Sequence, residues 1–578
     1  MAVRKASETK TGVSPKTAAS AKTAPAHHLA FSYASGAYES VTADALIVGV
    51  FSEKAAEDNG SAKSAEKNAE KKESEKKSYA STPALKALDK ALSGAISTVA
   101  PEEKFEGASG QLLMFRKLPG AKVNARRVIL LGLGEASKLN AKGLDKAIQK
   151  AIASVSGFDK MAHIALALPS DISDQKGLEA LSFEVALQTA VDAAAQCVYY
   201  SQEALPETQK KKQALKKITL LLNRPATAED KAILKIGEVM ARARAQCKDL
   251  VNKPPNIKRT DTLVEGAKAL AKKTGITVTV QSDVRWIEKN MPCFFAVAKG
   301  SLLSDPPKFI HIAYKPQSKS KNGKAKKKIA LIGKSVIFDT GGYQVKTGNY
   351  MNTMKGDMTG GAVMLSAMAA LAELQLPNIE VHAYMAATPN KIDTDAFLPD
   401  SIYPSTCGKF VEIRHTDAEG RLTLIDAVAK AYEQKPDEMV VMATLTGSAA
   451  QAVGMSIALM GNNDDLVGRV LKAAERHCEP IQSLKVTEDD YANIKSKLDG
   501  ADIINTNSGK GRGAQTAAAF VMSGAPKSLP IAHLDIAGAD MTSDEKATGI
   551  GQKTIIQYLL SENAALSASK VVAGKGKK

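Results

Sequence analysis

The feature that most constrains the fold is a regular alternation of strand-like and helix-like segments through the second half of the chain. The strand-like segments, which are apolar and rich in β-formers, are 276–280, 308–314, 328–333, 379–386, 410–414, 438–445, 455–460 and 530–536. The helical patterns are 261–273, 361–375, 420–433, 464–478 and 553–562. Alternation on this scale predicts a doubly wound α/β domain, with a mixed, mostly parallel sheet and helices on both faces.

The first half of the chain carries an α/β pattern of its own, and 578 residues are too many for one ordinary core. Strand candidates are 41–51, 127–134, 163–168 and 217–222, and helical patterns include 141–156 and 178–197. A helix at 227–250, stopped by Pro254 and Pro255, connects the halves. We therefore predict an N-terminal α/β domain at 29–225 and a larger C-terminal domain at 226–565.

Charge is concentrated in four segments. The ends, 1–28 and 566–578, each carry a net charge of +4 out of +17 overall, and we predict disordered basic tails there. Residues 53–78 hold seven lysines and seven acids, which predicts a charged surface insertion. Six lysines at 319–328, between two strand candidates, predict a long exposed hairpin loop. Lysine-rich segments attract polyanions, so non-specific nucleic-acid binding is one alternative and simple solvation is the other.

Cysteine usage and hydropathy exclude several classes of protein. The five cysteines are dispersed and form no CxxC pair, which favours reduced thiols in a cytoplasmic compartment. No apolar run approaches 18 residues without a charge, so no membrane helix is predicted. The N-terminus lacks the apolar core of a secretory signal, while its Ala, Ser, Thr and Lys content leaves organelle import as an alternative.

Two glycine-containing segments resemble nucleotide-binding motifs but do not complete them. Gly132-Leu133-Gly134 follows a strand candidate, but the third glycine of a dinucleotide fingerprint is missing. Gly333-Lys334-Ser335 lacks the glycine that a phosphate-binding loop needs five positions upstream, where Lys328 stands. Neither segment predicts a nucleotide site.

Carboxylates cluster near the ends of predicted strands in the C-terminal domain. Asp339 follows one strand candidate, Asp417 and Glu419 follow another, and Asp357 precedes a helix. Ligands of open α/β sheets bind outside the carboxyl ends of strands. Four like charges brought together there would raise one another's pKa unless cations neutralised them. The pattern therefore predicts a two-metal hydrolase site, in which Lys334 could ligate once its amine is neutral.

Two further cations accompany these carboxylates. Lys346 follows Asp339 by seven residues, across the Gly341-Gly342 turn, and could stabilise the oxyanion of a tetrahedral intermediate. Arg421 comes two residues after Glu419, and its planar fork suits a small anion or a carboxylate. Surface ion pairs would explain any one of these residues alone, but not seven around two glycine-rich turns.

These motifs resemble the signatures of the leucyl aminopeptidase (cytosol aminopeptidase) family of dinuclear metallo-exopeptidases. Gly333-Lys334-Ser335, then Phe338-Asp339-Thr340-Gly341-Gly342 and Lys346, is similar to the first signature, with Ser335 and Thr340 as variants. His415-Thr416-Asp417-Ala418-Glu419-Gly420-Arg421 is similar to the second, with His415 in place of Asn. The resemblance extends over most of 29–562.

The resemblance implies a complete site for hydrolysing the N-terminal bond of peptides. One metal, Zn²⁺ or Mn²⁺, would be held by Asp339, Asp417 and Glu419, and the other by Lys334, Asp339, Asp357 and Glu419. Lys346 would polarise the scissile carbonyl, and Arg421 would hold a bicarbonate that acts as general base. The substrate would contact Met354, Thr444, Leu445, Gly447 and Ala537. The resemblance also implies a homohexamer.

Some positions depart from the family pattern and leave alternatives open. Asp540 falls where an apolar pocket residue is expected, which suggests a preference for basic first residues over Leu. His415 is interpreted as a structural neighbour of the ligands, and segments 388–393 and 505–513 as changes of the rim. A nucleic-acid-binding protein and a homologue that has lost activity remain the two alternative functions.

Overall fold

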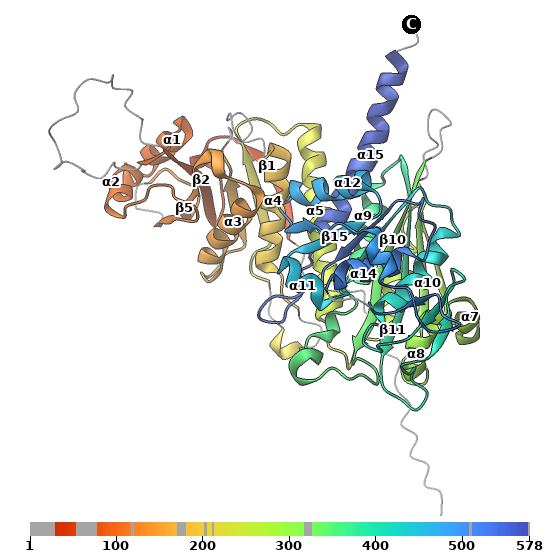
Figure 1. Ribbon diagram of the computed structural model, residues 1–578. Helices are drawn as coiled ribbons and strands as arrows, with labels where there is room; N and C mark the ends of the chain where they lie inside the picture. Colours follow the sequence, from red (N-terminus) through yellow and green to blue (C-terminus); the bar gives the residue numbers. More distant parts are fainter. Residues whose placement is uncertain are drawn as a thin grey trace, which may run out of the picture.

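The computed structural model describes residues 29–53, 78–116, 121–169, 181–201, 205–210, 213–316, 326–507 and 511–575. The N-terminal tail, nearly all of the 53–78 insertion and most of the 319–328 loop therefore lie outside the described residues. The prediction of a disordered C-terminal tail from residue 566 was wrong for 566–575, which continue the helix α15 (Gln552–Lys575). The described chain forms two α/β units, the first coloured red to yellow in Figure 1 and the larger one green to blue. No helix in these ranges is long and apolar enough to cross a bilayer.

The N-terminal unit is built on a seven-stranded sheet. Its order is β1 (Ala30–Ser35), β7 (Lys217–Leu222), β6 (His163–Ala167), β2 (Ala45–Glu53), β5 (Arg127–Gly134) and β4 (Leu112–Arg116), with β3 (Ser78–Tyr79) paired to β2. The strands from β1 to β5 in this order are parallel, whereas β3 and β4 run antiparallel to their partners. The sheet is therefore mixed and mostly parallel, as predicted for an α/β unit.

Helices cover both faces of this sheet because the side chains of its buried strands alternate between two cores. Ile47 packs into the core shared with α3 (Ala141–Ser156) and α4 (Phe183–Val198). Its neighbours Leu46 and Val48 pack into the core shared with α1 (Pro83–Ala91) and α2 (Ala95–Glu102). A strand buried on both faces reads as a continuous apolar run, which is the pattern seen in this part of the sequence.

The helix α5 (Ala228–Asn252) connects the two units. It begins at a capping box, in which Thr227 and Asp230 bond to each other's backbone amides, and it ends before Pro254. Arg244 on α5 forms a largely buried ion pair with Asp192 of α4, with 2.6 Å between Nη1 and Oδ2. The connecting helix thus contacts the N-terminal unit through this ion pair, in addition to being joined to it covalently.

The C-terminal unit is built on an eight-stranded mixed sheet. Its order is β16 (Ile481–Ser483), β15 (Ile457–Gly461), β18 (Ile531–Asp535), β14 (Glu438–Ala443), β10 (Lys327–Asp339), β11 (Ile379–Asn390), β9 (Lys308–Tyr314) and β8 (Ile276–Gln281). The centre of the sheet, from β18 through β14 and β10 to β11, is parallel. The strand β15 runs antiparallel to β18, and β9 and β8 are antiparallel on the other side.

Two groups of helices cover the two faces of this sheet. On one face lie α5, α6 (Thr260–Leu270), α9 (Thr359–Leu374), α12 (Asp464–Arg476) and α15 (Gln552–Lys575). On the other lie α7 (Val284–Asn290), α8 (Pro292–Ala298), α10 (Gly420–Tyr432), α11 (Gly447–Val453) and α14 (Gly513–Met522). Along β10, Ile329 and Leu331 join the first core, whereas Ala330 and Ile332 join the second. The predicted three-layer α/β architecture is confirmed.

Three expectations about this unit were wrong or incomplete. The 319–328 segment is not a hairpin loop, because β11 lies between β9 and β10 in the sheet. The strand β10 continues six residues past the predicted end at 333, so Lys334 lies within the strand and Asp339 ends it. The strand predicted at 410–414 is present as β13 (Phe410–Glu412), but it pairs with β12 (Ile402–Pro404) and β17 (Ile503–Ile504) in a separate small sheet. That sheet and α13 (Glu488–Ala492) were not expected.

Candidate active site

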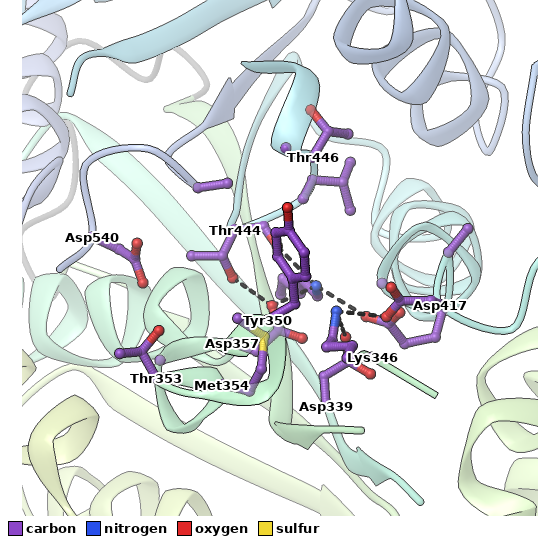
Figure 2. A pocket seen from close by; sticks show the side chains of 18 of the residues that line it. Asp339, Lys346, Tyr350, Thr353, Met354, Asp357, Asp417, Thr444, Thr446 and Asp540 are labelled. Atoms are coloured by element: carbon purple, nitrogen blue, oxygen red, sulfur yellow. Dashed lines mark hydrogen bonds and ion pairs between the residues drawn. The ribbon is translucent and has the colours of Figure 1, made fainter. Parts of the chain in front are cut away.

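A cavity of about 740 Å³ opens at the carboxyl ends of β10, β14 and β18. This is the edge of a parallel sheet at which ligands bind in open α/β folds. All twelve predicted site residues line the cavity: Lys334, Asp339, Lys346, Met354, Asp357, Asp417, Glu419, Arg421, Thr444, Leu445, Gly447 and Ala537. Figure 2 shows many of them converging from separate segments of the chain.

Lys334 occupies the centre of the buried carboxylate cluster. Its Nζ lies 2.6 Å from Oδ1 of Asp357 and 3.0 Å from Oε1 of Glu419, and it donates to the carbonyl of Thr444 at 2.8 Å. Gly420, at the start of α10, makes room for this side chain, because a Cβ there would lie 2.3 Å from Cε of Lys334. The lysine thus joins β10, the turn before α9 and the loop before α10.

Lys346 bridges the other two carboxylates. Its Nζ lies 2.8 Å from Oδ2 of Asp339 and 2.5 Å from Oδ1 of Asp417. Asp417 is about a quarter exposed, whereas the Asp339 side chain is 3% exposed. The Lys346 side chain is 14% exposed and that of Lys334 is 4% exposed, so this second amine lies nearer the mouth of the cavity.

The charges of the cluster depend strongly on one another. Burial, together with the charges of Glu419 and Asp339, raises the pKa of Asp357 well above its usual value despite the opposing effect of Lys334. Burial also raises the pKa of Asp339. Burial opposes the charged form of Lys334, but Asp357, Glu419 and Asp339 outweigh it and raise the pKa of the amine. Burial thus destabilises the charged form of these carboxylates, and the neighbouring lysine ammonium groups stabilise it.

The donor set fits divalent cations. Asp339, Asp417 and Glu419 offer ligand oxygens that all lie within 4.8 Å of one another. The buried Oδ2 of Asp357 has no hydrogen-bond partner within the described residues. Clustered carboxylate oxygens, with one left unpaired, are what a hard or borderline metal ion requires.

Asn390 supports the site, although its segment, 388–393, was interpreted as part of the rim. It ends β11 beside Asp339 in register, it is fully buried, and its Nδ2 donates to Oδ1 of Asp339 at 2.8 Å. It also donates to the carbonyl of Thr416 at 3.1 Å. The rim interpretation was wrong for this residue. Its place at the carboxyl end of a strand neighbouring β10 was the available signal.

Replacing Asn390 with alanine is expected to lower kcat/KM about 10- to 100-fold, as is typical when a residue that orients a metal ligand is lost. The reason is that Asp339 would lose the hydrogen bond that fixes its carboxylate. Steady-state kinetics over a range of metal concentrations would measure the effect. Unchanged metal dependence and unchanged kcat/KM would contradict the orienting role.

Asn505 fixes the loop that carries Asp417, and it too lies in a segment that was interpreted as rim. Its Oδ1 accepts from the amides of Arg414 and His415, and its Nδ2 donates to the carbonyl of His415 at 2.7 Å. His415 itself accepts from the amide of Asp417 through Nδ1 at 3.2 Å. These bonds are consistent with a structural role for His415.

Arg421 presents an unpaired donor to the site. Its side chain comes from the first turn of α10, it is 9% exposed, and its Nε has no hydrogen-bond partner within the described residues. Burial lowers the pKa of the guanidinium to about 10, a value at which it still carries a positive charge at neutral pH. A buried, unpaired guanidinium donor suits a small anion.

Asp540 lines the side of the cavity away from Lys346 (Figure 2). Its Oδ2 and the Cε of Met541 approach Gly356 so closely that a Cβ there would lie 2.8 and 2.4 Å from them. Burial raises the pKa of the Asp540 carboxyl to about 7. The sequence placed Asp540 in a pocket, and the structure agrees.

Tyr350, which sequence reasoning missed, is a lining residue that is 78% exposed. It belongs to the short helix η6 (Gly348–Met351), between Lys346 and Asp357. In the view of Figure 2 its ring stands in front of Asp357. No periodic pattern marked this segment, so only its position between two site residues could have indicated it.

Clustered carboxylates, two amines and a guanidinium whose Nε has no partner among the described residues lie at the strand ends of an α/β domain. Such a set defines a metallohydrolase centre. The sequence model of the cytosol aminopeptidase family, catalytic domain, matches residues 245–556, and that of the family's N-terminal domain matches residues 47–193. The chain belongs to the cytosol aminopeptidase family.

Known relatives agree over nearly the whole chain. A probable cytosol aminopeptidase of Aquifex aeolicus is 33% identical over 485 residues, covering 82% of this chain and 92% of the relative. Leucine aminopeptidase 1 of Arabidopsis thaliana is 32% identical over 529 residues, covering 90% and 94%. A mutant of tomato leucine aminopeptidase is structurally similar, with a TM-score of 0.77, 30% identity, and coverage of 93% and 98%.

A bottromycin maturation enzyme, BotP, in complex with Mn shares the fold, with a TM-score of 0.71 and 24% identity, covering 90% of this chain and all of that one. The family and fold predicted from the sequence are confirmed. The chain is a metal-dependent aminopeptidase, a hydrolase that acts on peptides. The family match and the relatives named above do not support the alternative of a nucleic-acid-binding protein.

Proposed function

We propose that the chain releases N-terminal residues from peptides at a centre of two divalent metal ions. Asp339, Asp417 and Glu419 would hold one ion, and Lys334, Asp339, Asp357 and Glu419 would hold the other. Lys334 would ligate as a neutral amine, since the positive charge of the two ions would favour loss of its proton. The observation that carries the proposal is the convergence of four carboxylates and an amine in one cavity, where Oδ2 of Asp357 has no hydrogen-bond partner among the described residues. When bound, the two ions would supply an activated water and polarise the scissile carbonyl.

Lys346 would stabilise the negative charge that develops on the substrate carbonyl. Its Nζ contacts the carboxylates of Asp339 and Asp417 near the cavity mouth. It can therefore also contact a substrate group that binds between these two carboxylates. Burial opposes its charged form, but Asp339 and Glu419 outweigh burial and raise its pKa, so the amine remains an ammonium at neutral pH. A fixed cation at this position favours an oxyanion over a neutral carbonyl.

Arg421 would hold bicarbonate as a general base. The support is the unpaired Nε of a buried guanidinium that faces the cavity. No described residue accepts a hydrogen bond from this Nε. Addition of bicarbonate should therefore raise the activity of the wild type and leave an Arg421→Ala variant unchanged.

Zinc or manganese are the proposed metals, because carboxylates with one amine ligand suit either ion. The Mn complex of BotP shows that a protein of this fold can bind manganese. We further propose a cytoplasmic homohexamer, with organelle import as the alternative location. The lysine tails and the 319–328 loop are proposed to add no more than non-specific, salt-sensitive contacts with nucleic acid.

The N-terminal side chain of the substrate would occupy the pocket formed by Met354, Thr444, Leu445, Gly447 and Ala537. Hydrolysis of Leu, Met, Arg, Asp and Cys-Gly substrates, with Mn²⁺ or Zn²⁺ supplied, would test the proposed function. Release of the first residue that depends on the metal is expected. Cleavage inside an N-terminally blocked peptide would contradict exopeptidase action.

Asp540 is expected to set the preference of this pocket for basic side chains. An ionised carboxylate would pair with the cation of Arg or Lys, and its pKa of about 7 means that it ionises as pH rises through neutrality. The ratio of Arg to Leu cleavage should therefore rise between pH 6 and 8. In Asp540→Leu it should fall about tenfold, which corresponds to about 1.4 kcal/mol, and lose its pH dependence.

Parallel kinetics on Arg and Leu p-nitroanilides would measure this ratio. Asp544→Leu is a matched control, since Asp544 is an exposed acid four residues further on. Much faster cleavage of Leu than of Arg at every pH, with no change in Asp540→Leu, would show that Asp540 does not meet the substrate.

A further inference from the structure

Lys258 is a fully buried lysine outside the cluster just described. It lies in the connection between α5 and α6, and it is 1% exposed. Burial, together with the charges of Lys355 and Lys253, lowers the pKa of its amine to about 7. Burying an amine is unfavourable unless its donors are satisfied, so the contacts of Lys258 show what retains it.

The amine of Lys258 joins two segments that are distant in sequence. Its Nζ donates to the carbonyl of Val251 at 3.0 Å and to the carbonyl of Lys355. Val251 is in the last turn of α5, where carbonyls lack partners within the helix and the helix dipole favours a cation. The lysine therefore stabilises the end of the connecting helix and ties it to residue 355.

Lys355 is the middle residue of a tight turn, η7 (Met354–Gly356), which directly precedes Asp357. The residue before the turn, Thr353, has φ of +66°, a left-handed conformation that is unfavourable for a β-branched side chain. Such a conformation persists only where surrounding contacts hold it. The bond from Lys258 is a contact that attaches this strained turn to a rigid helix.

Two residues close to Lys355 in the chain, Met354 before it and Asp357 two positions after it, line the cavity. Met354 forms part of the pocket wall, and the carboxylate of Asp357 bonds to Lys334 at 2.6 Å and to Thr444 Oγ1 at 2.8 Å. A shift of the turn would move both side chains together. The position of one proposed metal ligand is therefore coupled to the amine of Lys258.

We propose that Lys258 is a positioning residue, which holds the turn 354–356 against the end of α5 and so sets the positions of Asp357 and Met354. The inference rests on the proposed function, in which Asp357 is a metal ligand and Met354 contacts the substrate. Lys258 thus affects the binding of one metal ion and of the substrate's N-terminal side chain, although it contacts neither.

Calorimetric titration of the metal-free full-length chain with Mn²⁺ tests this inference, together with kinetics on Leu p-nitroanilide. In Lys258→Met, one of the two binding steps should weaken about tenfold or more, the loss typical of supporting residues around a metal. KM should rise, while kcat at saturating Mn²⁺ should stay within a few-fold of wild type, because the ligand set is intact. Lys355→Met, which removes a neighbouring cation from the same turn, is the control and should change neither.

The outcomes separate this inference from the proposed function. Wild-type Mn²⁺ affinity and wild-type KM in Lys258→Met would overturn the inference alone. A wild type that binds no pair of metal ions or does not hydrolyse the substrate would overturn the proposed function as well. If circular dichroism shows that Lys258→Met does not fold, Lys258→Arg keeps the charge and donors but displaces them, and it should show an intermediate loss of affinity for one ion. A wild-type titration in that variant would overturn the inference.

Discussion

Replacement of Lys346 with alanine is expected to lower kcat for Leu p-nitroanilide about 10²- to 10³-fold, the usual loss when one oxyanion-stabilising donor is removed. That loss corresponds to about 2.7–4 kcal/mol of transition-state stabilisation. The reason is that the amine of Lys346 is the cation that lies nearest the cavity mouth, beside Asp339 and Asp417. Both carboxylates remain in the variant, so metal binding should persist.

Steady-state kinetics and metal analysis by mass spectrometry, made on the same protein sample, would separate these effects. Lys355→Ala, a change of a nearby lysine without an ion pair among those described, serves as control and should retain activity. Activity of Lys346→Ala within tenfold of wild type would remove Lys346 from the proposed mechanism. Loss of the metals would instead show that the amine has a structural role in the cluster.

Removal of the metals by chelation is expected to abolish hydrolysis and to lower thermal stability. The carboxylates of Asp339 and Asp357 are destabilised by burial, so cations that bind only the folded state should stabilise it. A ligand at 100 times its Kd contributes about 2.7 kcal/mol per site. The melting temperature of the chelated enzyme should therefore fall by several degrees.

Calorimetric melting before chelation, after it, and after return of Mn²⁺ would test this prediction. Activity and melting temperature should both recover on return of the metal, since the ligands remain in place. Full activity after exhaustive chelation would contradict metal-dependent catalysis in this chain. An unchanged melting temperature would indicate that the cluster is held by its own lysines alone.

The site could be predicted from the sequence because its residues lie in two short motifs. Lys334, Asp339 and Lys346 come from the first, and Asp417 and Glu419 from the second, about seventy residues after Lys346. Parallel strands bring such motifs to one edge of a sheet, so their order in the chain was enough to predict convergence. The layers of the fold followed similarly from apolar periodicity.

Residues that act through tertiary contacts could not be predicted in this way. Asn390 was interpreted as rim because its segment departs from the family pattern, but strand register places it against Asp339. Lys258 lies in a segment that reads as an ordinary polar connection, yet the packing of α5 and η7 buries it completely. In both cases the partner is far away in sequence. The place of Asn390 at the end of a strand was the only signal for it, and Lys258 had none.

The order of the strands in the sheet could not be predicted from the sequence either. The lysine-rich segment at 319–328 lies between two consecutive strands, and consecutive strands often pair, which favoured a hairpin. The structure inserts β11 between β9 and β10. Likewise β10 continues through Lys334 and Ser335, polar residues that end the apolar run but are buried and hydrogen-bonded in the centre of the sheet.

The most direct test of the account is the number of metal ions bound per chain in the wild type and in Asp357→Ala. Reconstitution with Mn²⁺, removal of excess metal and mass spectrometry of the metal content would measure it. Two ions per chain in the wild type and one in the variant, with loss of Leu p-nitroanilide hydrolysis, are predicted, because Asp357 is assigned to one of the two sites. Two ions and full activity in Asp357→Ala would contradict the proposed centre.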